Sequence, residues 1–245
     1  MAIVKQTLHI FATAAKPADL TFSRSTSATR VNDIGRIELV PANVIRQDFD
    51  SVTTGSIMGW LLEESSSNLC LQSQDLGTTW ITTNAVQTNL ASLTTNTTKS
   101  PDGTNNADTL AAGSSATGIV AARQQGFTFT NGTHYTVSVF AKKKDMDYLE
   151  ISNKDDNATG MTFSQAFNLS AGSTGSSGGS VYAASMRAFP NGWYRCEVSF
   201  EATANSTAEV FLKARTNNAN SSTFAATSGQ GIYLWGMQVE AKKYA

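Results

Sequence analysis

Histidine and cysteine are both scarce in this chain, which contains two of each among 245 residues. His9 and His134 stand in no H-E-x-x-H or Cys/His spacing, so the sequence offers no histidine-rich metal site. Cys70 and Cys196 are too few for a disulfide framework. We expect each to be a small buried apolar residue with a free thiol, and a single bridge between them is the alternative.

Charged residues are also few. They make up 15% of the chain, and 18 basic against 19 acidic residues give a formal net charge of -1. This balance argues against nucleic acid or a membrane as a partner held by electrostatic attraction. No apolar run has the length of a membrane span. The apolar stretch at residues 8–15 is interrupted by His9 and Thr13, so a cleavable signal peptide is not expected.

None of the common enzyme motifs stands in the context that it needs. No G-x-S-x-G, P-loop or G-x-G-x-x-G lies between a strand and a helix. Carboxylate pairs that could serve a glycosidase lie in polar surroundings, which do not favour the raised pKa of a catalytic acid. These pairs are Glu63/Glu64, Asp48/Asp50, Asp145/Asp147 and Asp155/Asp156. The last two could donate oxygens to calcium but lack EF-hand spacing. We therefore expect no enzyme, no cofactor and no metal.

The abundant polar residues are threonine, serine and asparagine, as in residues 93–99 and 216–223. Threonine suits exposed strand faces, and asparagine and serine suit tight turns. The apolar fraction of 40% is enough for a sizeable core, and helix signals are weak throughout. The composition predicts an all-β protein.

Residues 1–65 differ from the rest of the chain. Residues 29–31 and 36–40 flank the sequence NDIG at 32–35, which predicts a β-hairpin with glycine at the exit of its turn. The segment is too short and too polar to own a good core. We expect an irregular N-terminal hairpin arm that docks on the following domain, a sister subunit or a larger particle.

Residues 66–245 contain about eight or nine short strand segments at hairpin spacing, which favours a β-sandwich of the jelly-roll type. The predicted strands include residues 68–71, 80–83, 135–142, 148–151, 161–163, 181–186, 192–200, 208–214 and 231–240. Residues 100–104 (SPDGT) are a predicted turn, because proline fixes φ and Asp-Gly supplies a tight bend. Residues 170–180 are a predicted flexible loop.

The closing strand at residues 231–240 is apolar in both alternating registers. Ile232 and Leu234 are expected on one face with Gly236, and Trp235 and Met237 on the other with Tyr233 and Val239. The pattern predicts a strand that is covered on both faces. Trp235 is therefore expected to fill the core.

Aromatic side chains are the candidates for a binding site, because flat rings with polar tips can stack on sugars. We predict Trp193, Tyr194 and Trp80 as glycan-binding residues. Trp193 is the strongest candidate, since it follows the Asn191-Gly192 turn at the start of a strand. Packing in the core is the alternative for each ring.

Two series of motifs follow one another along the chain. The first consists of residues 22–31 (FSRSTSATRV), Gly35, residues 59–65 (GWLLEES), residues 68–69 and Ser73. It resembles a module of bacteriophage virion proteins that is often described as a phage head spike fibre domain. The second consists of Trp80, residues 100–104 with Ala107, residues 135–142, 192–195 and 233–240. It is similar to carbohydrate-binding-module jelly rolls.

The resemblance implies a β-rich, virion-attached homotrimer without catalytic residues that could be transferred. Because the chain lacks the long body of a tail spike, we expect a capsid decoration, cement or head fibre protein, on the capsid surface rather than the tail. Residues 1–65 would bind the major capsid protein or another virion protein. The jelly roll at 66–245 would face outward.

Two alternatives stay open. The first is a tail fibre, tail spike or receptor-binding module that binds host surface glycans, which requires at least one of Trp80, Trp193 and Trp235 to face solvent. The second is a spike that cleaves polysaccharide, which requires two carboxylates to converge in a groove.

Overall fold

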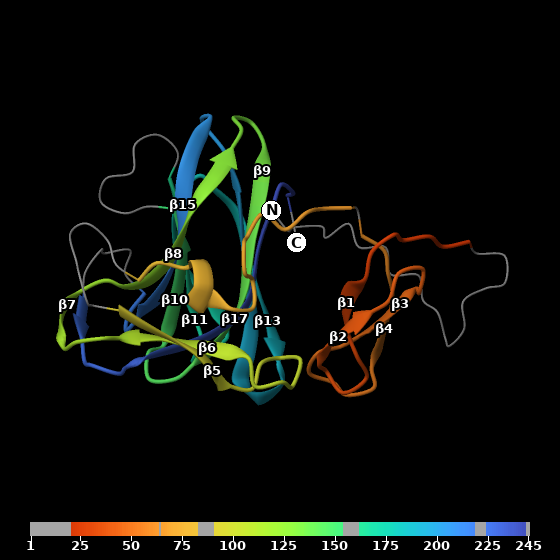
Figure 1. The fold of residues 1–245 in the computed structure, drawn as a ribbon, viewed down its shortest axis with the longest axis horizontal. Coiled ribbons are helices and arrows are strands. Elements are labelled where there is room, and N and C mark those ends of the chain that lie inside the picture. Colours follow the sequence, from red (N-terminus) through yellow and green to blue (C-terminus); the bar gives the residue numbers. More distant parts are fainter. Residues whose placement is uncertain (1–20, 64, 83–90, 154–161, 219–223, 244–245) are drawn as a thin grey trace. The chain divides into compact units, whose positions relative to one another are not determined.

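The computed structural model describes residues 21–63, 65–82, 91–153, 162–218 and 224–243. The chain forms two compact units (Figure 1). Unit 1 consists of Met1–Ser65, Pro101–Gly103 and Ala188–Asn191. Unit 2 consists of Ser66–Ser100, Thr104–Arg187 and Gly192–Ala245.

The described residues of unit 2 form two large sheets and one small one. The strands of the two large sheets are β5 (Ala91–Thr98), β6 (Ala107–Ala112), β8 (Val120–Phe129), β9 (His134–Lys143), β10 (Tyr148–Ser152), β11 (Phe163–Asn168), β12 (Ser173–Gly179), β13 (Val181–Phe189), β14 (Trp193–Glu201), β15 (Ser206–Arg215) and β17 (Gly231–Glu240). One sheet has the order β12-β11-β10-β15-β8, and the other has the order β13-β14-β9-β17-β6-β5. Short elements complete the unit: β7 (Ala116–Gly118), which pairs with β16 (Phe224–Ala226), and the helix α1 (Leu76–Thr79). A 3-10 turn at Pro190–Gly192 lies where the chain passes from unit 1 to unit 2.

The core of unit 2 lies between these two sheets. Every second side chain of β9 and β14 belongs to this core and comes from one sheet. Every second side chain of β10 and β15 belongs to it as well and comes from the other sheet. The buried side chains include Val137, Val139, Val198, Leu149, Ile151, Val210 and Leu212. Two sheets that share one apolar layer form a β-sandwich, which confirms the predicted fold class.

The closing strand β17 departs from the predicted alternation. Gly236 has a φ of 66°, and the register with β9 shifts between Trp235 and Gln238. Such a bulge adds one residue and reverses the faces that follow. As a result, Ile232 and Leu234 share the core with Met237 and Val239. The prediction of one continuous alternation was wrong, because it did not include the bulge.

Residues 170–180 were predicted as a flexible loop, and this prediction is wrong. Residues 173–179 form β12, which pairs with β11. The Asn218 side chain accepts a hydrogen bond from Ser176 N at 2.8 Å, and Gln165 Nε2 donates to Gly175 O at 3.1 Å. A glycine- and serine-rich segment can therefore form a strand when a neighbouring strand supplies its backbone partners.

The strands predicted at 68–71 and 80–83 do not form as such. Leu69 N donates to Val239 O at 2.7 Å, and Ser73 O accepts from Met237 N at 3.0 Å, but no strand is assigned at 68–71. Ile81 makes an isolated bridge to Arg123. Residues 83–90 lie outside the described residues.

The two cysteines are free and buried, as expected. Burial raises the pKa of the Cys70 thiol to about 12. Burial and the neighbouring charge of Glu197 also raise the pKa of Cys196 well above its ordinary value. Both thiols are therefore poor nucleophiles at neutral pH.

The described residues of unit 1 form two hairpins. β1 (Ala28–Val31) pairs with β2 (Ile37–Val40), and β3 (Arg46–Phe49) pairs with β4 (Ile57–Leu61). The first hairpin confirms the prediction for residues 29–40. Gly35 at its turn has a φ of 77°, and a Cβ there would lie 2.5 Å from Ser51 O.

The predicted turn at residues 100–104 is also confirmed. Ser100 N donates to Thr104 O at 2.9 Å, and Gly103 has a φ of 89°.

Asp108 in β6 ties α1 and β5 to the sandwich. Its buried carboxylate accepts hydrogen bonds from Leu76 N at 2.8 Å and Asn96 N at 2.9 Å. Burial raises the pKa of Asp108 above its ordinary value, and the charge of Asp75 adds to this, although the two hydrogen bonds oppose it. The native carboxyl thus binds its proton more tightly than the unfolded one.

This pKa predicts a pH effect on stability. The contribution of Asp108 to the free energy of unfolding should fall as pH rises from the ordinary aspartate pKa of about 4 through the raised value. Asp108→Asn should lose about 1–3 kcal/mol through a missing acceptor, and its deficit should shrink as pH rises. Urea unfolding between about pH 3.5 and pH 7 measures this. A deficit that grows with pH would contradict the prediction.

Candidate functional site

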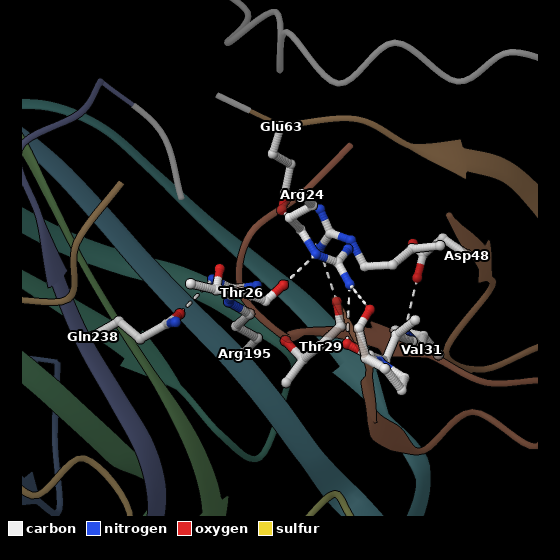
Figure 2. A network of polar contacts seen from close by, with 11 residues as sticks. Arg24, Thr26, Thr29, Val31, Asp48, Glu63, Arg195 and Gln238 are labelled. Atoms are coloured by element: carbon white, nitrogen blue, oxygen red, sulfur yellow. Dashed lines mark hydrogen bonds and ion pairs between the residues drawn. The ribbon is translucent and has the colours of Figure 1, made fainter. Parts of the chain in front are cut away.

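The two hairpins of unit 1 are joined by side chains rather than by a backbone ladder. Arg46 Nη1 donates to Thr29 O at 2.8 Å, Val31 N donates to Asp48 Oδ1 at 2.8 Å, and Arg30 Nη1 donates to Gln47 O at 3.0 Å. Figure 2 shows Asp48 beside Val31 along this seam. Arg46 and Asp48 are both buried. Buried charged groups thus satisfy edge backbone groups of β1 and β3.

Arg24 fixes the beginning of the described chain to the end of β2. Its Nε donates to Thr26 O at 2.7 Å, and its Nη2 donates to Val40 O at 3.0 Å and Pro41 O at 2.5 Å (Figure 2). Burial and the nearby charge of Arg46 lower the pKa of Arg24 from its ordinary value. The guanidinium has several donors in a rigid plane, which suits it to several carbonyls at once.

Three polar side chains of the first hairpin, Arg30, Asn32 and Glu38, form one hydrogen-bonded group. Arg30 Nε donates to Glu38 Oε1 at 2.6 Å, and Asn32 Nδ2 donates to Glu38 Oε2 at 3.1 Å. Burial alone would raise the pKa of Glu38, but these hydrogen bonds and the Arg30 charge lower it. This pair is half-exposed and contributes less than a buried one.

Unit 1 exposes more large apolar side chains than it buries within residues 21–65. The buried ones are Val31, Val40 and Trp60, whereas the exposed ones are Ile34, Leu39, Val44, Val52, Ile57 and Met58. In the part of unit 2 that the structure describes, the exposed large apolar residues are Leu69, Leu71 and Tyr182. Side-chain contacts to the backbone thus contribute to holding the hairpins of unit 1 together, while most large apolar side chains of residues 21–63 that are either buried or exposed lie at the surface.

Four of these exposed residues lie on or beside two loops that touch. Gly55 N, in the turn of the second hairpin, donates to Asp33 O in the turn of the first at 2.7 Å. Ile34 and Val52 lie in these two turns, and Ile57 and Met58 follow directly at the start of β4. We call these four residues the apolar tip.

Unit 2 carries a buried charge cluster on β10 and β15. Lys213 Nζ contacts Glu150 Oε1 at 3.0 Å, and Arg215 Nη1 contacts Glu150 Oε2. The adjacent core residues Leu149 and Ile151 point to the sandwich interior, so Glu150 points to the other side of the sheet. These charged groups satisfy one another, and we assign them a structural role.

The predicted glycan-binding residues do not form a surface. Trp193 is 1% exposed and its Nε1 donates to Lys99 O at 3.1 Å, and Trp80 is 6% exposed within the core. Tyr194 is half-buried and packs against the core. Trp235 is buried as well. The glycan-binding alternative required at least one of Trp80, Trp193 and Trp235 to face solvent, and all three are buried.

Glycan binding by Trp193, Tyr194 and Trp80 itself stays a prediction. Of the three, only Tyr194 is not fully buried. The exposed aromatic residue that the sequence analysis did not select is Tyr182 in β13. The alternation of apolar and polar residues around Tyr182 does not distinguish this residue from the buried tyrosines.

Two carboxylates of the predicted pairs contact lysine side chains. Asp147 contacts Lys143 at 2.6 Å, and Asp145 contacts Lys144. Glu64, Asp155 and Asp156 lie outside the described residues. Where the chain is described, no group of three or more histidine, cysteine or acidic residues is placed to hold a metal ion. The described helices include none that is long and apolar enough to cross a membrane.

No protein-family model matches the chain, and no curated protein matches it. One similar solved structure is the enzymatically active domain of tailspike protein 4 of bacteriophage CBA120, with a TM-score of 0.39 and 12% identity over 70% of this chain and 21% of that chain.

Another is a Clostridium thermocellum endo-1,4-beta-D-xylanase, comprising CBM22-1 and GH10 modules in complex with xylohexaose. The TM-score is 0.38, with 11% identity over 73% of this chain and 28% of that chain. This chain thus spans less than a third of the length of either structure.

Proposed function

We propose that this chain is a non-enzymatic structural protein of a bacteriophage particle. Unit 1 attaches it to the major capsid protein or another virion protein, and the jelly roll of unit 2 faces outward. The observation that carries the proposal is the apolar tip, together with the small core of unit 1. Apolar side chains that a compact unit leaves exposed are typical of a protein interface.

The resemblance of the motif series at residues 22–73 to virion modules supports the phage assignment. We place the protein on the capsid surface as a decoration, cement or head fibre protein, and as a homotrimer. A symmetric particle repeats each modest contact many times, so the attachment of an oligomer does not need one tight site.

The test uses the full chain and particles that lack this protein. Ile34→Ser combined with Val52→Ser should weaken binding to these particles at least tenfold, because it removes apolar area from the tip. Leu71→Ser is the matched control, since Leu71 is an exposed apolar residue of unit 2 (65%). Co-sedimentation measures the bound fraction.

Deletion of residues 1–65 gives a second readout. Unit 2 should keep its β-type circular dichroism spectrum and lose attachment. Decoration that survives this deletion, or that Leu71→Ser weakens as much as the tip variant does, would contradict attachment through unit 1.

A further inference from the structure

The two turns that carry the apolar tip are held in one arrangement by contacts within unit 1. Gly35 has a φ of 77°, and a Cβ at this position would lie 2.5 Å from Ser51 O, so only glycine fits this close approach of the turns. Ser51 is buried, and its hydroxyl donates to Ala188 O at 2.5 Å. Together with the hydrogen bond from Gly55 N to Asp33 O, these contacts preorganise the tip for a partner.

The apolar tip also carries negative charge. Its segments, residues 32–35 and 50–58, contain two carboxylates and no lysine or arginine. Asp33 is exposed in the first turn. Asp50 Oδ1 accepts a hydrogen bond from Val52 N at 2.9 Å, which places its charge beside an exposed apolar residue. Exposed apolar side chains and two negative charges thus lie together at the tip.

The basic side chains of unit 1 contact groups outside the tip. The described residues of this unit contain no lysine. Arg24, Arg30 and Arg46 donate to backbone carbonyl groups of the two hairpins and the residue that follows β2. Arg36 follows the first turn, but its guanidinium lies against Gly103, where a Cβ would be 3.0 Å from Arg36 Nη1. The charges that the tip itself presents to a partner are therefore negative.

We propose that the apolar tip docks on an apolar site of the virion partner that is bordered by lysine or arginine side chains. This inference rests on the proposed function and specifies the chemistry of the partner surface. Asp33 and Asp50 supply the charges that match the basic border, and such pairs guide association more than they add affinity. The apolar centre consists of Ile34 (49% exposed), Val52 (64%), Ile57 (45%) and Met58 (39%).

The salt dependence of binding separates the charged contribution from the apolar one. At an ionic strength of about 1 M the Debye length is only about 3 Å, so attraction between charges across the interface is screened. Apolar burial is not weakened in this way. The full chain should therefore associate with particles that lack it at least tenfold more slowly at about 1 M than at about 0.05 M sodium chloride. Biolayer interferometry on immobilised particles measures the association rate constant.

Asp33→Asn tests the charge with almost no change of shape. At about 0.05 M salt it should lower the association rate constant at least threefold, and at about 1 M salt it should match the parent. Asp50 is left unchanged because its carboxylate holds the second turn. Glu201→Gln is the matched control, since Glu201 is an exposed carboxylate of unit 2, and it should associate like the parent at both salt concentrations. Both variants should retain the circular dichroism spectrum of the parent.

The Ile34→Ser and Val52→Ser double variant completes the comparison. Its weaker binding should persist at about 1 M salt, because the apolar contribution is not screened. An association rate that does not fall with salt would overturn the basic border and leave attachment through unit 1 intact. So would an Asp33→Asn variant that associates at low salt as fast as the parent does. Failure of the unmodified chain to bind would instead overturn the proposed function.

Discussion

Glu150→Gln is expected to lower the free energy of unfolding by about 3–5 kcal/mol, as is typical when one member of a buried ion pair is removed. The substitution keeps the shape of the side chain and removes the negative charge that Lys213 and Arg215 both contact. Both buried cations then lose their contact with a negative charge at position 150, which raises the free energy of the folded state. Urea unfolding followed by tryptophan fluorescence measures the loss.

The matched control is Asp145→Asn. Asp145 also contacts a lysine, Lys144, but both side chains are partly exposed. Exposed pairs contribute about 0–1 kcal/mol, so the control should unfold close to the parent. A loss below about 1 kcal/mol for Glu150→Gln would show that water compensates the cluster in solution.

Phe200→Ala is expected to cost about 3–5 kcal/mol, the range for a buried aromatic residue. Phe200 is fully buried on β14 and stacks on Phe163 with ring centroids 3.9 Å apart. Phe129 and Tyr135 contact the same ring, at 5.4 and 5.9 Å. Because the residue connects rings from both sheets, its removal leaves a cavity that neither sheet can fill alone.

Thermal and urea unfolding measure this effect. Tyr182→Ala is the control, since it removes an exposed aromatic side chain and should cost less than about 1 kcal/mol. A similar cost for both variants would mean that Phe200 does not have the central place in the core that its ring contacts indicate.

The parts of the fold that the sequence predicts correctly are those determined by residues close together in the chain. The turn at residues 32–35 needs Gly35 at a positive φ, and the turn at 100–104 needs Gly103 for the same reason. These signals lie within the turns themselves. The bulge at Gly236 and the pairing of β12 depend on residues far along the chain. The alternating pattern of residues 231–240 and the composition of residues 170–180 therefore gave wrong expectations.

The candidate site residues also divide into features with local signals and features that depend on distant residues. A turn before Trp193 favours an outward ring, but the acceptor of its N–H is Lys99 O, 94 positions away. In sequence, the exposed apolar residues of unit 1 look like the apolar residues of any strand. Only the three-dimensional fold shows that their side chains are exposed. The spacing of Arg24, Arg46 and Asp48 likewise gave no sign that they hold the hairpins together.

The side-chain seam of unit 1 has a consequence for the order of folding. The contacts of Arg46 with Thr29 and Glu63, of Arg30 with Gln47 and of Asp48 with Val31 each span 17 positions. In unit 2, β17 must meet β9, where Gln238 and Ser138 are 100 positions apart. Short loops close faster than long ones. We therefore expect the side-chain contacts of unit 1 to form before β17 pairs with β9 in unit 2.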